Sequence, residues 1–170
     1  MTVREILKEP NKLLRQISET VEKIGDEERR LMDDMLDTMY AAPGIGLAAI
    51  QIGVAKRIIV MDISRDEIKK EPMYFINPII KNRNNEKAKY EEGCLSVPDQ
   101  FAEIERPSSC EIEYLDYDGK KKLLKADGLL ATCIQHEIDH LEGILFIDYL
   151  SKLKKSIIIK KLSKVKRKIF

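Results

Sequence analysis

The only two histidines of this 170-residue chain, His136 and His140, lie four residues apart in the segment "CIQHEIDHLEG" (133–143). Residues four apart on an α-helix share a face, so both imidazoles can bind one metal ion if this segment is helical. Glu137 neighbours the first histidine, where its carboxylate can reach a water molecule on that ion. Two ligands do not complete a site, so the fold must bring a third ligand to this helix.

The third ligand does not match the positions used by protease families that carry this motif. One class places a histidine six residues after the second one, where this chain has Phe146. Another class uses a later glutamate, but the only acid after Glu142 is Asp148, which is too near to return from a second helix. The ligand must therefore lie upstream, where a cysteine thiolate is the natural candidate for a late first-row ion.

Of the three cysteines, Cys94 is the best placed to complete the site. Cys133 lies two helical turns from His140, roughly 10 Å at 1.5 Å per residue, and Cys110 alternates within an apolar strand as a packing residue would. Cys94 follows Gly93 in "YEEGCLSVP", where a strand can deliver its sulfur to the helix. One cysteine and two histidines leave a coordination position open, which is typical of a catalytic site.

The remaining patterns predict an α+β fold. Apolar spacing predicts helices over 13–24 and 26–42, the second capped by Asp26. Strand-like runs follow at 57–62, 73–80, 94–98, 110–116 and 121–126, and "YDGK" between the last two indicates a hairpin. Asp127 is expected to cap a helix over 129–142 that ends at Gly143, and a further helix covers about 150–168. We expect one domain, residues 1–170, with antiparallel or mixed short strands around the central HExxH helix, N-terminal helices and a C-terminal helix.

Composition favours a cytoplasmic protein. The segment "MTVREILKEP" carries Glu5 and Glu9 where a signal peptide would have an apolar core, and no apolar run approaches the length of a membrane span. Three cysteines cannot all pair, which fits a reducing compartment.

The charge of the chain is unevenly distributed. Residues 151–170 contain eight lysines, Arg167 and no acid, a charge of +9, so the net +1 leaves −8 for the preceding 150 residues. A basic end on an acidic body indicates a polyanionic partner.

Three segments, in this order, resemble the motifs of the bacterial-type, metal-dependent peptide deformylases: "GIGLAAIQ" (44–51), "EGCLS" (92–96) and "HEIDH" (136–140). The resemblance covers nearly the whole chain. It implies a hydrolase that removes the formyl group from the N-terminal formylmethionine of newly made proteins and releases formate. The first segment also satisfies a dinucleotide-binding fingerprint, but that reading needs a preceding strand, and here a helix is expected before it.

The resemblance implies the catalytic roles. The side-chain N–H of Gln51 and the backbone N–H of Leu95 would form an oxyanion hole for the intermediate. Glu137 would take a proton from the attacking water and later deliver it to the departing amine.

It also implies the substrate contacts. Ile45 and Gly46 would meet the peptide through main-chain groups. Ile45, Leu129 and Cys133 match positions that line the methionine pocket, and Glu92 sits at its edge. Phe101 departs from the pattern, because many bacterial members carry arginine at this pocket mouth.

The implied cofactor is one divalent ion per chain held by Cys94, His136 and His140, with ferrous iron as the native ion and zinc or nickel as other ions that fit. The implied partners are N-formylmethionyl nascent peptides. We also expect the basic C-terminal helix to contact the RNA-rich ribosome exit region through phosphate, without reading a nucleic-acid sequence, and we expect no membrane partner.

Two alternatives stay open at this point. A zinc metallopeptidase is disfavoured by the missing downstream ligand. A non-catalytic ribosome-binding module with a structural metal would have no need for Glu137 beside an open coordination position.

Overall fold

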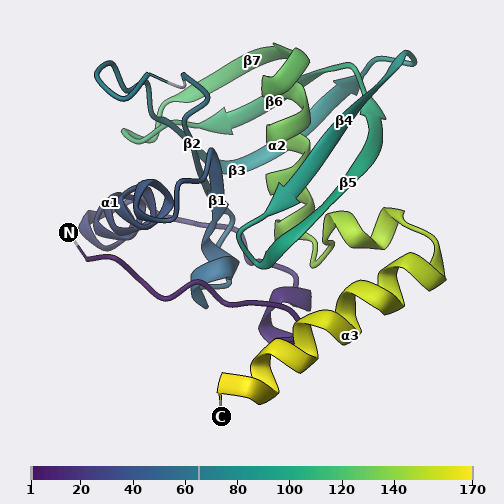
Figure 1. The fold of residues 1–170 in the computed structure, drawn as a ribbon. Helices are drawn as coiled ribbons and strands as arrows, with labels where there is room; N and C mark the ends of the chain where they lie inside the picture. The colour runs from purple at the N-terminus through teal and green to yellow at the C-terminus, as the bar shows by residue number, and fades with distance from the viewer. Residues whose placement is uncertain (1, 65, 170) are drawn as a thin grey trace.

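The computed structural model describes residues 2–64 and 66–169, with side chains described as far as Val165. Within these residues the helices are α1 (Asp26–Ala41), α2 (Gly128–Leu141) and α3 (Lys152–Ile169), joined by the 3-10 turns η1 (Lys12–Arg15), η2 (Ala49–Ile52) and η3 (Phe146–Tyr149). The strands are β1 (Gly46–Ala48), β2 (Ile58–Met61), β3 (Met73–Arg83), β4 (Lys87–Cys94), β5 (Val97–Pro107), β6 (Ser109–Leu115) and β7 (Lys121–Asp127). Figure 1 shows their arrangement.

The strands form two antiparallel units. Five of them make a sheet in the order β1-β2-β3-β6-β7, while β4 and β5 form a separate hairpin. Helix α2 lies between the sheet and the hairpin, and α3 runs past the lower end of the hairpin (Figure 1). The arrangement confirms the predicted α+β class with a central HExxH helix.

Both faces of the sheet are covered, as the burial of strand β2 shows. All four of its residues are buried, and successive side chains of a strand point to opposite faces. Ile58 and Val60 therefore pack with the buried methionines of α1, whereas Ile59 and Met61 pack with the apolar face of α2. The sheet thus gives α2 a rigid base, and α2 is the element that carries both histidines.

The N-terminal region differs from the prediction. The expected helix over 13–24 is wrong: after the short turn η1 the chain is extended as far as α1. Its backbone is drawn into tertiary contacts, since Ser18 N donates to Leu141 O, Glu19 N to Ala55 O and Val21 N to the side chain of Asn77. These bonds replace the i→i−4 bonds that a helix would need.

Both expected helix caps also differ in detail. Helix α1 has Gly25 as its N-cap, and the Glu28 carboxylate accepts a hydrogen bond from Gly25 N at 2.9 Å, so Asp26 is the first helical residue instead of the cap. Asp127 does occupy the N-cap of α2 but makes no side-chain capping bond.

The hairpins are longer than the strand-like runs indicated. The "YDGK" turn joins β6 to β7 as predicted. The run 94–98, however, is the tight turn between β4 and β5, whose polar, half-exposed arms extend over residues 87–107. Helix α3 begins at Lys152, and of its apolar residues Ile158 and Leu162 are buried while Leu153, Ile157 and Val165 are exposed. The side chains of Arg167 and Ile169 lie outside the described residues.

None of the helices in the described residues combines the length and the apolar character that crossing a bilayer requires.

Candidate metal centre and active site

Three potential metal ligands converge at one point. Helix α2 presents His136 and His140 on the same face, and the end of β4 supplies Cys94. One ligand atom from each of the three residues lies within 4.8 Å of the others, and Cys94 Sγ is 3.3 Å from His140 Nε2. A register shift after Glu92 breaks the β4–β5 ladder, which turns the following residues away from the regular strand direction and toward α2.

The donor set fits a late first-row divalent ion. Two imidazole nitrogens and a thiol sulfur are the ligands that such ions prefer, and three protein ligands leave a position for water or substrate. His136 and His140 are 8% and 1% exposed, so an ion bound there would be shielded on its protein side. Cys133 is not part of this cluster, because it packs in the apolar core, where burial raises the pKa of its thiol.

The ring of His136 is fixed from behind by charged groups. Its Nδ1 lies 2.8 Å from Glu92 Oε1, which leaves Nε2 to face the ligand cluster. Arg106 donates two hydrogen bonds to the same carboxylate, at 2.7 and 2.9 Å. Burial alone would raise the pKa of Glu92, but the hydrogen bonds from His136 and Arg106 lower it, so Glu92 is ionised.

Glu137 lines the cavity with one carboxylate oxygen left without a partner among the described residues. It is 4% exposed, and its Oε2 has no hydrogen bond to any described residue. Burial raises the pKa of Glu137 to about 7. The carboxylate packs directly against Gly46 of β1, where an added Cβ atom would lie 2.5 Å from Glu137 Oε1. A carboxylate held in this way is suited to exchange a proton with a bound water or amine.

The Gln51 amide is locked beside the cysteine. Gln51 is 1% exposed, and its Oε1 accepts from Ala48 N at 2.9 Å. This bond orients the amide NH₂, which lies 3.6 Å from Cys94 Sγ and 3.1 Å from Ser96 Oγ. Leu95, the other expected oxyanion donor, lies between these two residues in the β4–β5 turn. Fixed N–H donors next to a metal site can stabilise developing negative charge.

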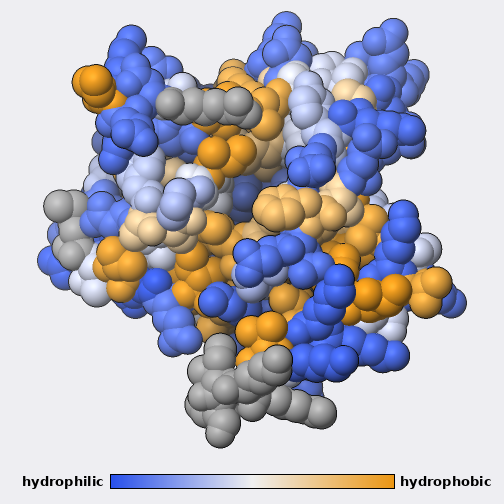
Figure 2. All heavy atoms as spheres, viewed as in Figure 1, coloured by the Kyte–Doolittle hydropathy of each residue, from blue (hydrophilic) through white to orange (hydrophobic). Residues whose placement is uncertain are grey.

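A cavity of about 1160 Å³ opens over these groups. Figure 2 shows a hollow near the centre of the viewed face, with hydrophilic atoms at its floor and hydrophobic residues beside it. The cavity is lined by all five residues expected to contact substrate: Ile45, Gly46, Glu92, Leu129 and Cys133. Gln51, Cys94, Leu95, His136 and Glu137 also line it, whereas His140 lies deeper.

Phe101 covers part of the cavity mouth. Its side chain is 66% exposed and packs on the backbone of Gly93, where an added Cβ atom would lie 2.6 Å from the ring. An apolar ring thus occupies the position at which the resemblance would have supplied a guanidinium.

Sequence reasoning missed the residues that support the histidines. Arg106 is 4% exposed and also binds Asp139 at 2.8 Å, and Phe146 stacks on His136 with ring centroids 6.2 Å apart. One signal was present: Ile104 and Arg106 alternate in one strand, which places an arginine on the same face as a core residue, where it requires an acidic partner.

The segment 44–51 does not have the setting of a nucleotide-binding loop, because α1 precedes its glycines and only the short strand β1 and the turn η2 follow them. A dinucleotide fingerprint requires a strand before the glycines and a helix after them.

Comparisons with known proteins agree on one family. The model of the Polypeptide deformylase family matches residues 3–156. The chain is 84% identical over 166 residues to the peptide deformylase of Pelagibacter ubique (strain HTCC1062), covering 98% of this chain and 96% of that protein. It is 58% identical to the peptide deformylase of Phenylobacterium zucineum (strain HLK1), covering 96% and 97% of the two chains. The crystal structure of the Ehrlichia chaffeensis peptide deformylase in complex with actinonin superposes with a TM-score of 0.92 at 48% identity, covering 98% of this chain and 99% of that one. This chain therefore belongs to the polypeptide deformylase family.

Proposed function

We propose that this protein hydrolyses the N-formyl group of formylmethionine at the N-terminus of newly made polypeptides, releasing formate and a free amine. The observation that carries the proposal is the convergence of Cys94, His136 and His140 with an unpartnered Glu137 in one open cavity. A single catalytic domain spanning residues 1–170 and located in the cytoplasm is part of the same proposal.

Each side chain has a separate role in the reaction. A divalent ion held by Cys94, His136 and His140 would supply Lewis acidity, polarising the formyl carbonyl and making water nucleophilic. Glu137 accepts the proton of the attacking water and returns it to the amine as the C–N bond breaks. The Gln51 amide and the backbone N–H of Leu95 donate to the oxygen that becomes negative in the tetrahedral intermediate.

The substrate is held by the walls of the cavity. Ile45 and Gly46 contact its backbone, while Ile45, Leu129 and Cys133 enclose the methionine side chain. Glu92 borders this pocket and, through its bond to His136, also fixes a ligand.

The resident ion we propose is ferrous iron, with zinc and nickel as ions that the same donors accept. One cysteine thiolate and two neutral imidazoles fit all three ions, so the test is metal analysis of protein purified without oxygen.

The decisive assay measures formate release from a formyl-Met peptide by the anaerobically purified protein. The acetyl-Met peptide of the same sequence is the matched control, since it differs only in the acyl group. The unformylated peptide tests for peptidase activity. Formate release from the first peptide alone supports the proposal, and cleavage of the peptide chain without formate would replace it with a peptidase function. Actinonin, which the Ehrlichia chaffeensis relative binds in its crystal structure, is expected to inhibit.

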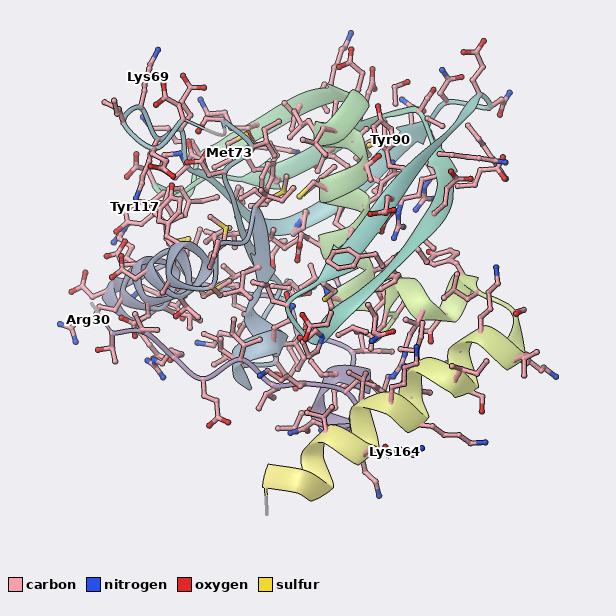
Figure 3. The ribbon with its side chains drawn as sticks, in the orientation of Figure 1. Arg30, Lys69, Met73, Tyr90, Tyr117 and Lys164 are labelled. Atoms are coloured by element: carbon pink, nitrogen blue, oxygen red, sulfur yellow. The ribbon has the colours of Figure 1, made fainter. Side chains whose placement is uncertain are left out.

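We propose in addition that α3 contacts the ribosome near the exit of the nascent chain. Supporting this, Lys160, Lys161 and Lys164 are exposed, and residues 151–170 contain no acid to neutralise them. Contacts to RNA phosphate weaken steeply with salt. Figure 3 shows Lys164 on α3, at the end of the molecule away from β7.

Reversing Lys160, Lys161 and Lys164 to glutamate should therefore weaken cosedimentation with ribosomes. Reversing three exposed lysines of β7, Lys121, Lys122 and Lys125, is the control for net charge. Equal cosedimentation of the two triple variants would rule out a specific role for α3. Hydrolysis of a free formyl-Met peptide should be unchanged in the β7 variant; Lys161 also lines the cavity, so hydrolysis by the α3 variant is measured alongside its cosedimentation.

A further inference from the structure

The ligand His136 is linked to the molecular surface by a continuous run of side chains. We propose that Tyr149, on η3, is a positioning residue that holds His136 in its ligating orientation. It acts through three side chains that lie between them, Asp139, Arg106 and Glu92. The inference rests on the proposed function only in taking His136 to be a metal ligand.

The inner half of the run is buried and tightly bonded. Glu92 accepts from His136 Nδ1 at 2.8 Å, and the guanidinium of Arg106 grips that carboxylate through Nε and Nη2. The side chains of Glu92 and Arg106 are each 5% exposed. Two parallel N–H···O bonds leave the carboxylate little freedom to rotate, so the position of Arg106 sets the orientation of the imidazole.

The outer half holds Arg106 in place. Its Nη1 donates to Asp139 Oδ2 at 2.8 Å, and the Tyr149 hydroxyl donates to the same oxygen at 2.7 Å. The Tyr149 ring also lies against the guanidinium, with Arg106 Cζ 4.9 Å from the ring centroid. Burial and the bond to Asp139 raise the pKa of the Tyr149 hydroxyl to about 12, so it remains a donor at neutral pH.

The turn η3 holds Tyr149 in a fixed position. Phe146, at its start, stacks on the His136 ring with an interplanar angle of 25°, and Ile147 is fully buried. Asp148 binds Leu145 N and pairs with Arg15 and Lys155. The turn is thus anchored at each residue, and it meets His136 twice: directly through Phe146 and indirectly through Tyr149.

The test must disturb the run without unfolding the site. Removing Arg106 would leave Glu92 charged, buried and unpaired, so its loss would be uninformative. Tyr149→Phe is milder, because it keeps the ring over the guanidinium and removes only the hydroxyl. The matched control is Tyr117→Phe, which removes a hydroxyl that likewise donates to a carboxylate, that of Asp33. Figure 3 shows Tyr117 above α1, well separated from η3 and α3.

The readout is Co²⁺ binding by metal-free protein, measured by competition with a chelator, together with the visible spectrum of the Co²⁺ protein. Partners of a ligating histidine typically contribute 10–100-fold to affinity, and the Tyr149 hydroxyl acts three contacts beyond the direct partner Glu92, so we expect Tyr149→Phe to bind about 3–10-fold more weakly. Its ligand-field bands should shift, because the imidazole is less fixed. Tyr117→Phe should match the wild type in affinity and spectrum.

Two results would contradict the inference, and they differ in their consequence for the function. If wild type and Tyr149→Phe bind Co²⁺ with equal affinity and the same spectrum, Tyr149 is an ordinary surface contact and the proposed function is unaffected. If the wild-type protein binds no Co²⁺, the metal site and the proposed function fail together.

Discussion

Gly46→Ala should damage catalysis while leaving the metal site intact. A Cβ atom at this position would lie 2.5 Å from Glu137 Oε1 and 2.9 Å from its Cδ, whereas ordinary contacts begin near 3.4 Å. Strand β1 is paired with β2 through Gly46 and Met61, so its backbone is held and the carboxylate must move. The required displacement is about 0.9 Å, and a misplacement of about 1 Å can cost on the order of 10²-fold in rate. We therefore expect kcat to fall by about 10²-fold.

The assay is steady-state hydrolysis of a formyl-Met peptide, with metal content and thermal unfolding measured on the same preparation. Gly25→Ala is the control glycine variant, because its added Cβ would have Glu28 Oε2 as nearest neighbour at an unstrained 3.6 Å. A double variant tests the route of the effect. If the cost of Gly46→Ala runs through Glu137, the substitution should change little in a Glu137→Gln background.

Activity of Gly46→Ala within about threefold of wild type would refute the steric argument, since the expected loss is far larger. Loss of bound metal at normal stability would also refute it, because the displaced group would then be a ligand and not Glu137.

Five other substitutions test separate parts of the site and fold. Cys94→Ser should lose the ion, while Cys133→Ser keeps it; metal analysis giving the reverse would assign the ligand to Cys133. Glu137→Gln should retain metal and KM while kcat falls by about 10²–10⁴-fold, the usual cost of a lost general base. Gln51→Leu should lower kcat more than it changes KM, because its donor bonds strengthen in the transition state. Glu28 has its pKa lowered to about 2 by the hydrogen bonds from Gly25 N and Lys56, so its contribution to stability is present above pH 4.5 and is lost as pH falls toward 2. Glu28→Ala should therefore cost about 1 kcal/mol in urea unfolding at pH 7, and a difference from wild type that stays constant down to pH 2 would exclude this capping role.

The parts of the fold that sequence predicts well are those whose pattern reflects their own burial. Helices α1 and α2 have apolar periodicity and strand β2 is a continuous apolar run, and each is buried as its pattern requires. The segment 13–24 has comparable periodicity, but its backbone hydrogen bonds go to Leu141, Ala55 and Asn77, partners that are distant in sequence. Apolar periodicity reflects only local spacing, so it cannot show that distant residues take the backbone hydrogen bonds of this segment.

The residues of the site also differ in how well the sequence predicts them. The pair His136 and His140 is visible because four-residue spacing has one meaning on a helix, and elimination leads from there to Cys94. The supports of His136 come from three other elements, β4, β5 and η3, and their contacts depend on how the hairpin folds over α2. Arg106 carries no motif, so its role emerges only when its two carboxylate partners are seen beside it.

Strand β1 ends the five-stranded sheet, and this placement bears on how many different proteins the enzyme can serve. Among the residues that the structure describes, it pairs with β2 on one side only, and its first residue, Gly46, lines the cavity. An extended peptide can add to an open strand edge through backbone groups that every amino acid possesses, while a side-chain pocket reads one chosen residue. A substrate bound in this way would be selected by its first side chain and would meet few sequence demands behind it.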